Sequence, residues 1–351
     1  MDLVDLDIGK SVNKKWVVEA KLGEGACGVV YRVHDVENKK IKAALKVEGS
    51  NDDLGVLKKE SSVIKQLQQR KHVVRLIHCG RRDTYSYVVM TLYGKNLNQL
   101  KKEYELKNFT PGCVSKIAVQ TMYAMKQVHE IGFVHRDVKP SNIVIGRQGI
   151  EKRMIFLIDF GMCRAYTIWE DGVARHRRAR EKALLRGTSR YCSPYVHMRQ
   201  EQSRRDDMFS LIYVMVELAD RLVWTGKKEP ETGKIKNELP DEKLLENCPP
   251  EWTDILAHIR GLTYEDRPNY RLIYDKLIAT MTRLKTTFSD LYDWEIIQNQ
   301  AKSKETTREK SSTQSSADAR STFTGSKKEK ENPYPFPTVL PSEFDSNDIK
   351  I

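Results

Sequence analysis

The hydrophobic pattern of this 351-residue chain changes near residue 93, and this change limits the possible fold more than any other feature. Before it, residues 16–92 contain short β-branched and apolar runs separated by turn residues, which predict strands. From Gly94 onward, apolar residues recur three or four positions apart, as in amphipathic helices. The pattern therefore predicts an α+β protein in which a small strand-rich lobe precedes a larger, mainly helical lobe.

In the first lobe the pattern predicts strands at residues 16–22, 29–33, 43–48, 73–77 and 87–90. Residues 53–69 carry apolar side chains at helical spacing, so one helix is expected between the third and fourth strands. We expect these strands to form a small antiparallel sheet.

In the second lobe the pattern predicts helices at residues 112–131, 208–218, 252–262 and 270–284. The helix at residues 208–218 is apolar nearly all round, which indicates a helix buried inside its lobe. Because ligands commonly bind between lobes, we expect the functional site at the boundary between the two.

The lobes define a domain at residues 16–295, with residues 16–92 and 94–295 as its two parts. Residues 1–15 form an N-terminal extension, and residues 296–351 are rich in Ser, Thr, Lys and Glu without apolar periodicity. We expect this second segment to be a disordered tail.

The composition indicates the compartment and the kinds of partner. No run approaches the roughly 18–20 apolar residues of a membrane span, the start is acidic, and six cysteines are scattered without a paired motif. We therefore expect a cytoplasmic protein, with the nucleus as a second compartment, and no membrane partner. The net charge of +12 would suit an acidic protein, a phosphate-rich ligand or nucleic acid, although a solvated basic surface explains it equally well.

One motif carries the strongest chemical signal: the sequence His-Arg-Asp-Val-Lys-Pro-Ser-Asn at residues 135–142, followed by Asp-Phe-Gly at residues 159–161. Asp137 can accept a hydrogen bond and a proton from a substrate hydroxyl, and Lys139 can neutralise a moving phosphoryl group. Asn142 and Asp159 offer oxygen ligands to Mg²⁺. The alternative, a polar turn between apolar strands, would not require these residues at these spacings.

Around this motif, His135 and Phe160 are expected to support the loop by packing, and Gly161 to act as a hinge.

A glycine run, Gly23-x-Gly25-x-x-Gly28, is weak evidence alone because a dinucleotide-binding fold can also contain one. Here the glycines connect two predicted strands, which favours a hairpin that covers the phosphates of a nucleotide. Lys46 in the following strand could reach the α- and β-phosphates, and Glu60 on the predicted helix could pair with that lysine. A Gly-rich turn and solvated surface charges remain the alternative explanation for these residues.

Taken together, these motifs resemble those of eukaryotic protein kinases over about residues 16–295. The run Arg204-Arg205-Asp206-Asp207 and the closing Asp293-Trp294-Glu295 resemble the casein kinase I superfamily. Residues 87–97 and 186–191 are most similar to its tau-tubulin kinase branch.

The resemblance implies the two-lobed protein kinase fold and a serine/threonine kinase that uses ATP and Mg²⁺. It implies Met90 as the gatekeeper beside the adenine, Leu92 in the hinge, Thr188 near Asp137, and Asp207 as a brace for the catalytic loop. The residues expected at ATP are Leu22, Gly23, Glu24, Gly25, Ala26, Cys27, Gly28, Val29, Val30, Ala44, Lys46, Met90 and Leu92.

The chain departs from most kinases at Ser193-Pro194-Tyr195, where they carry Ala-Pro-Glu. The casein kinase I group lacks that motif too, so the departure supports the placement. It leaves Arg267 without the glutamate that normally pairs with the equivalent arginine, and the sequence does not identify another partner.

A basic cluster lies between Asp159 and Ser193, where a kinase contacts its substrate. Its members are Arg175, Arg177, Arg178, Arg180, Lys182, Arg186 and Arg190. Several charge-assisted bonds of about 1.5–3 kcal/mol each could select acidic or phosphorylated proteins, and cytoskeletal substrates would fit because tubulin tails are acidic.

A solvated basic loop is the alternative explanation of this cluster. Nucleic-acid binding is disfavoured because the stretch contains no Phe, Tyr or Trp before Tyr191. We expect an active, monomeric kinase, and the rival from another class is a kinase-fold scaffold that acts only by binding. The intact set of Lys46, Asp137, Asn142 and Asp159 argues against that rival.

Overall fold

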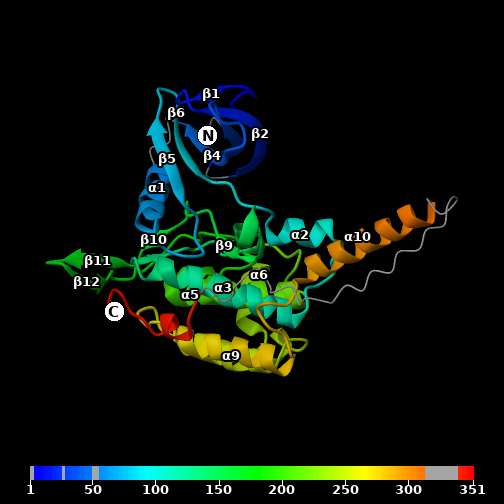
Figure 1. Ribbon diagram of the computed structural model, residues 1–351. Coiled ribbons are helices and arrows are strands. Elements are labelled where there is room, and N and C mark those ends of the chain that lie inside the picture. Colours follow the sequence, from blue (N-terminus) through cyan, green and yellow to red (C-terminus); the bar gives the residue numbers. More distant parts are fainter. Residues whose placement is uncertain (1–3, 26–27, 50–54, 313–338) are drawn as a thin grey trace.

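The computed structural model describes residues 4–25, 28–49, 55–312 and 339–351, and it has a strand-rich lobe above a helical lobe (Figure 1). The segment that follows β6 passes from the first lobe into the second (Figure 1). The predicted α+β class and the two-lobed fold are confirmed.

The first lobe contains a six-stranded antiparallel sheet with the strand order β1-β2-β3-β4-β6-β5. The strands are β1 (Ser11–Val12), β2 (Trp16–Gly25), β3 (Gly28–Asp35), β4 (Lys42–Gly49), β5 (Leu76–Arg81) and β6 (Tyr85–Thr91). The helix α1 (Val56–Gln66) packs beside the sheet and presents Leu57, Val63 and Ile64 to the core. The described part of the N-terminal extension, residues 4–15, is not separate from this lobe, because β1 pairs with β2 and Leu6 is buried.

One predicted strand lies elsewhere. The pattern placed a strand at residues 73–77, but β5 begins at Leu76. Val73 and Val74 are fully buried, and Val73 bridges to Leu157 of the second lobe. These two valines pack between elements outside the sheet. Their apolar, β-branched side chains therefore reflect burial and not membership of a strand.

The second lobe is built mainly from helices: α2 (Leu97–Glu103), α3 (Pro111–His129), α4 (Pro194–His197), α5 (Arg204–Ala219), α6 (Glu231–Glu238), α7 (Asp241–Leu244), α8 (Glu251–Arg260), α9 (Tyr270–Arg283) and α10 (Asp293–Ser312). Two-stranded pairs join β7 (Phe133–Val134) to β10 (Arg164–Ala165), β8 (Ile143–Ile145) to β9 (Ile155–Leu157), and β11 (Thr167–Glu170) to β12 (Val173–His176). The described residues also contain the short 3₁₀ helices η1 (Pro140–Asn142), η2 (Gly149–Arg153) and η3 (Pro341–Phe344).

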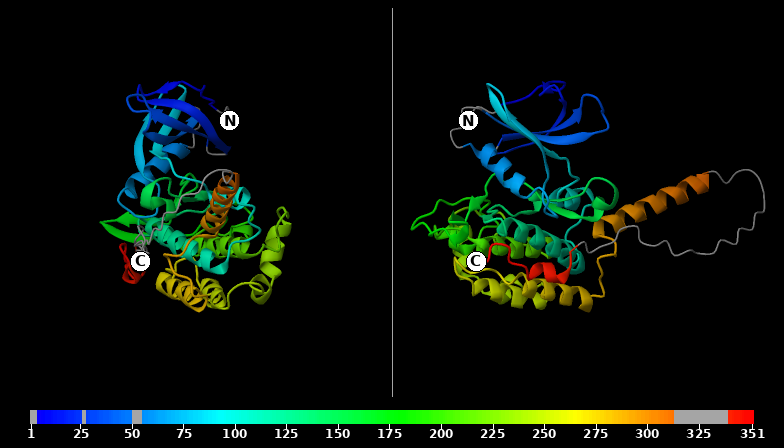
Figure 2. Two further views of the ribbon diagram at one scale, coloured as in Figure 1. Left: turned by 45° about the vertical axis from the view of Figure 1, so that its right-hand side comes forward. Right: turned by 60° about the vertical axis from the view of Figure 1, so that its left-hand side comes forward.

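Helices α3 and α5 form the centre of this lobe (Figure 2). The prediction that residues 208–218 form a buried helix is confirmed, because α5 is buried from Arg204 to Val216. Helix α3 is also buried all round, although its sequence includes charged residues. Lys116 is buried because its ammonium donates to the carbonyls of Asp290 and Leu291.

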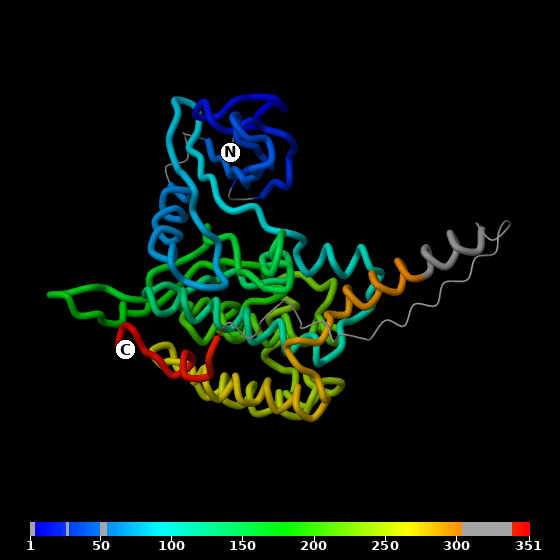
Figure 3. Tube along the Cα trace, viewed as in Figure 1, coloured from blue at the N-terminus to red at the C-terminus, as the bar shows by residue number. Residues whose placement is uncertain are grey.

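The structure corrects the expectation of disorder from residue 296 onward. Helix α10 continues to Ser312, and residues 339–351 pack against the second lobe beside α9 (Figures 1 and 3). Residues 296–312 include several Lys, Glu and Gln residues, which favour helix without an apolar stripe. Residues 313–338 lie outside the described part of the chain.

Among the described residues, no helix combines the length and apolar character that crossing a membrane requires.

Candidate active site

The catalytic loop, residues 135–142, follows β7 and is held by the buried helix α5. The carboxylate of Asp207 accepts hydrogen bonds from the backbone N–H groups of His135 (2.7 Å) and Arg136 (2.8 Å). Arg136 has a φ of 67°, a conformation that non-glycine residues rarely adopt. These two hydrogen bonds stabilise the strained turn that presents Asp137, which is the bracing role that the resemblance implied for Asp207.

Asp207 is positioned in turn by a histidine that the sequence analysis did not identify. His129, at the end of α3, donates from Nε2 to the Asp207 carboxylate at 2.9 Å, and the Tyr270 hydroxyl donates to His129 Nδ1 at 2.6 Å. Burial alone would raise the pKa of Asp207, but the hydrogen bond from His129 helps to lower it below its ordinary value. The carboxylate therefore remains ionised in the core and continues to accept the hydrogen bonds from the loop.

Three groups surround the carboxylate of Asp137. The Thr188 hydroxyl donates to Oδ1 at 2.7 Å, and the Thr188 backbone N–H donates to the same oxygen at 3.1 Å. The Lys139 ammonium lies 2.7 Å from Oδ2, and the Asn142 amide donates to the Asp137 backbone carbonyl at 3.0 Å. The structure thus brings four of the predicted residues together at one point.

The support expected from His135 is present. Its Nε2 donates to the carbonyl of Ile158 at 3.2 Å, and its Nδ1 accepts from the N–H of Asp137 at 3.3 Å. The ring of Phe160 meets the His135 ring edge to face, with centroids 5.2 Å apart. His135 therefore connects the catalytic loop to the Asp159-Phe160-Gly161 motif.

Lys46, in β4, has its ammonium buried between two carboxylates. Its Nζ lies 2.7 Å from Glu60 Oε2 on α1 and 2.9 Å from Asp159 Oδ1. Burial alone would lower the pKa of Lys46, but the two carboxylates raise it above its ordinary value. The ammonium therefore stays charged, as it must to bind phosphate oxygens.

Asp159 and Asn142 supply oxygen atoms of the kind that a divalent cation prefers. Asp159 has a φ of 68°, and its side chain retains about a third of its surface exposed. Burial alone would raise the pKa of Asp159, but the Lys46 ammonium lowers it, so the group is a carboxylate at neutral pH. Asn142 uses its Nδ2 to donate to Asp137, which leaves Oδ1 as the ligand atom, and this donor set fits the metal expected from the sequence.

The glycine run forms the hairpin of β2 and β3, in which Gly25 pairs with Gly28. Gly28 has a φ of 108°, and a Cβ built on it would lie 2.1 Å from the carbonyl oxygen of Val47, so no side chain fits there. Ala26 and Cys27 lie outside the described residues. Leu22 lies within β2, directly before Gly23, and is exposed.

Strand register decides which of the remaining residues face the predicted nucleotide. Val30 pairs with Lys46, and Ala44 pairs with Met90, so these four side chains lie on the same face of the sheet. Val29 points to the opposite face, where it packs in a separate core, so its side chain is directed away from the face that carries Lys46. Neighbouring residues of a strand point to opposite faces of the sheet, and the motif alone does not tell which residue points to which face.

Gly23 and Glu24 belong to β2 and are exposed, and Leu92 is half-buried just after β6, at the start of the connection between the lobes.

Part of the basic cluster is already paired with acidic groups of the chain itself. Arg180 pairs with Glu201, and Arg190 pairs with Glu217 at 2.9 Å. Arg175 pairs with Glu170, which leaves this end of the cluster less basic than its sequence suggests. The members without an ion pair to a described acidic residue are Arg177, Arg178, Lys182 and Arg186.

The partner of Arg267 is Glu130, the residue after α3. The Arg267 guanidinium lies 3.0 Å from Glu130 Oε1, and the Lys126 ammonium lies 3.3 Å from the same oxygen. No local pattern marked Glu130, because its role depends on α3 and the segment before α9 lying side by side.

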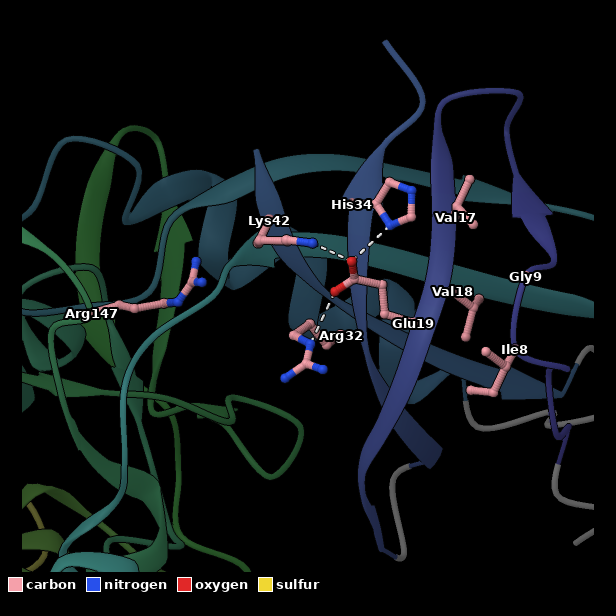
Figure 4. A pocket seen from close by; sticks show the side chains of 9 residues that line it. All are labelled: Ile8, Gly9, Val17, Val18, Glu19, Arg32, His34, Lys42 and Arg147. Atoms are coloured by element: carbon pink, nitrogen blue, oxygen red, sulfur yellow. Dashed lines mark hydrogen bonds and ion pairs between the residues drawn. The ribbon is translucent and has the colours of Figure 1, made fainter. Parts of the chain in front are cut away.

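A hollow of about 590 Å³ lies on the first lobe and is lined largely by β2, β3 and β4 (Figure 4). The Glu19 carboxylate at its centre lies 3.0 Å from Arg32 Nε and 2.9 Å from His34 Nδ1, and it also pairs with Lys42. Register places these basic side chains on the sheet face that carries Lys46. The cluster therefore joins three strands by ion pairs beside the predicted nucleotide-binding face.

Comparison with known proteins identifies relatives of the whole two-lobed unit. The protein kinase domain family matches residues 16–291. A putative serine/threonine-protein kinase of Caenorhabditis elegans is 38% identical over 294 residues, which cover 83% of this chain and 84% of the relative. Casein kinase I homolog 3 of Schizosaccharomyces pombe is 32% identical over 292 residues, covering 80% of this chain and 65% of the relative. An inactive tau-tubulin kinase of C. elegans is 34% identical over 251 residues, covering 67% of this chain and 86% of the relative.

Proposed function

The chain belongs to the protein kinase family, within the casein kinase I superfamily and related to the tau-tubulin kinases, and from this premise we propose that it is catalytically active and uses Mg²⁺ with ATP to phosphorylate acidic or already phosphorylated proteins. As a protein serine/threonine kinase, it acts on protein substrates and uses ATP with a divalent metal.

The observation that carries the proposed activity is the assembled polar set. Lys46, Glu60 and Asp159 form one chain of ion pairs, and Asp137 is held by Thr188 and Lys139. A kinase needs the Lys–Glu pair and the metal-binding aspartate in place at the same time.

The roles follow from this chemistry. Lys46 binds phosphate oxygens, and Asp137 accepts the hydrogen bond and the proton of the attacking Ser or Thr hydroxyl. Thr188 fixes the orientation of the Asp137 carboxylate, and Lys139 neutralises charge on the transferred group. The metal, when bound by Asn142 and Asp159, neutralises phosphate charge.

The rival is a kinase fold that acts only by binding, and one relative is named an inactive tau-tubulin kinase. Incubating the purified chain with labelled ATP, Mg²⁺ and a mixture of acidic proteins tests this alternative. We expect label transfer to protein by the parent and none by Asp159→Ala. Equal labelling by the two proteins, or no labelling by either, would refute the proposed activity.

The basic cluster supports the proposed substrate preference through its unpaired members. Arg178 and Lys182 are exposed and form no ion pair with a described acidic residue, so they are available to carboxylates or phosphates of a substrate. One relative is named a tau-tubulin kinase, and tubulin tails are acidic, so cytoskeletal proteins are further candidates. We further propose that the kinase is a monomer of the cytoplasm, and of the nucleus in addition.

A peptide array with acidic, phosphorylated and neutral residues around the acceptor tests this preference. We expect Arg178→Ala combined with Lys182→Ala to raise KM for acidic peptides more than for neutral ones, because each charge-assisted bond contributes about 1.5–3 kcal/mol. Arg81→Ala, which removes an exposed arginine of β5, is the matched control. A parent enzyme that shows no preference for acidic or phosphorylated peptides would contradict the proposal.

A further inference from the structure

Residues 339–351 bind to the second lobe as a short peptide would (Figure 3). The anchor is Phe344, which is fully buried. Its ring stacks on Tyr274 of α9 with centroids 4.6 Å apart, and it meets Tyr123 of α3 edge to face at 5.6 Å. Aromatic contact on two sides fixes this residue in one position.

Ion pairs fix the direction and register of the segment. Its acidic side chains Glu343, Asp345 and Asp348 each meet a basic side chain of the domain. The pairs are Glu343 with Lys71 at 3.3 Å, Asp345 with Arg271 at 3.0 Å, and Asp348 with Arg70 at 2.6 Å. Three matched pairs along one short segment indicate specific docking rather than chance collapse.

A second apolar anchor reaches the base of the catalytic loop. Ile349 is buried in a small cluster with Val134, Tyr166 and Ala174. Val134 directly precedes the catalytic loop, and the Tyr166 hydroxyl donates to the carbonyl of His129 at 2.8 Å. Since His129 holds Asp207, the segment packs against the groups that position the loop.

Glu130 joins the segment to the same region. Its carboxylate is buried and accepts from the backbone N–H of Asp348 in addition to pairing with Arg267 and Lys126. Arg267 also donates to the carbonyl of Ser346. Release of the segment would remove hydrogen-bond acceptors and donors from a buried network next to His129. The residues of this network would then be less ordered.

We propose that residues 339–351 are an intrachain docking peptide whose binding to α3 and α9 stabilises the active arrangement of the catalytic loop. The surface that receives it, defined here as the docking surface, consists of Arg70, Lys71, Tyr123, Lys126, Glu130, Arg267, Arg271 and Tyr274. It fits an acidic peptide with a central aromatic residue and an aliphatic residue five positions later.

The direction of the effect follows from where the segment lies. Within the described residues, it forms no hydrogen bond or ion pair with Lys46, Asp137 or Asp159, so it does not block these groups. It contacts the supports of the catalytic loop instead. A bound group favours the conformation that it binds more tightly, so docking favours the ordered loop.

The test uses the full chain with Phe344→Ala, which removes the buried ring. Leu340→Ala is the matched control, because Leu340 belongs to the same segment but its side chain is exposed. We expect Phe344→Ala to lower kcat about 5- to 20-fold, a typical size for coupling between two sites. We also expect faster hydrogen exchange at the N–H groups of His135 and Arg136, and no change in either property for the control.

Adding a synthetic peptide of residues 339–351 to Phe344→Ala should restore kcat and slow the exchange, whereas the same peptide with Phe344→Ala should not. Restoration would separate docking from simple misfolding of the variant. An unchanged kcat and exchange rate, a higher kcat, or a loss that the peptide cannot restore would each overturn the proposal.

The activity measurement rests on the proposed kinase function, but the hydrogen-exchange measurement, with and without the added peptide, does not. A parent protein without activity would therefore refute the proposed function and leave docking to be decided by hydrogen exchange.

Discussion

Replacing Asp207 with Asn tests the idea that one buried carboxylate holds the catalytic loop. The substitution keeps the shape of the side chain and removes its charge. In the parent, Oδ2 accepts from the N–H of His135 and from Nε2 of His129, and Oδ1 accepts from the N–H of Arg136. An amide has only one acceptor oxygen, so at least one of these donors must face an NH₂ group.

The magnitude follows from these three bonds. The donor that loses its acceptor is buried and costs about 1–3 kcal/mol, and the two remaining bonds change from charge-assisted to neutral at about 1 kcal/mol each. We therefore expect Asp207→Asn to lower the free energy of unfolding by about 3–5 kcal/mol. Arg136, at a φ of 67°, would lose an anchor of its strained turn, and a shift of Asp137 by about 1 Å can lower kcat on the order of 100-fold.

Urea unfolding followed by tryptophan fluorescence measures the first quantity, and steady-state phosphorylation at a temperature where the variant is folded measures the second. Asp171→Asn is the control, because Asp171 is exposed at the turn between β11 and β12 with a φ of 51° that Asn also tolerates. An Asp207→Asn protein with the stability and kcat of the parent would refute the bracing role.

Three further perturbations test other parts of the site. Glu60→Gln removes one charge partner of the buried lysine in β4. It should lower kcat/KM for ATP about 10- to 100-fold in steady-state assays, which is equivalent to about 1.5–3 kcal/mol. A kcat/KM equal to that of the parent would contradict the role of this ion pair. Burial lowers the pKa of His72 to about 4, so its contribution to stability is present above pH 6.5 and is lost as the pH falls toward 4. Asn tolerates the same positive φ, so His72→Asn is the test variant. Between pH 6.5 and pH 4, the free energy of unfolding should fall by about 3 kcal/mol less in His72→Asn than in the parent, as measured by urea or thermal unfolding at several pH values. Identical pH profiles of the two proteins would count against this assignment. Gly28→Ala should lower the free energy of unfolding by about 1–3 kcal/mol because its Cβ would meet the Val47 carbonyl, whereas Gly25→Ala has open space and serves as the control; equal stability of the two variants would contradict the close approach.

Much of the fold follows from short-range pattern. Apolar spacing predicted α8 and α9 nearly to their ends, and α5 from Met208 onward, because each of these helices buries the residues that its own sequence marks as apolar. The same reasoning misplaced the strand at residues 73–77, because buried valines in a connection look like a strand. It also missed the helix after residue 296, which has good helix formers but no apolar stripe.

The catalytic motifs could be recognised without coordinates because phosphoryl transfer requires particular side chains at fixed short spacings. Their supports could not. His129 meets Asp207, Glu130 meets Arg267, and Phe344 meets Tyr274 across 70 or more residues, and no local spacing records such pairs.

Chain order alone therefore established the chemical groups that this kinase can use and the types of most of its elements, since both depend on neighbours a few positions apart. Folding in three dimensions settled the rest. It determined which face Val29 takes, which of the arginines between β10 and α4 are neutralised, and where residues 339–351 bind. These outcomes depend on strand register, burial and long-range charge pairing, which arise only when distant segments pack against one another.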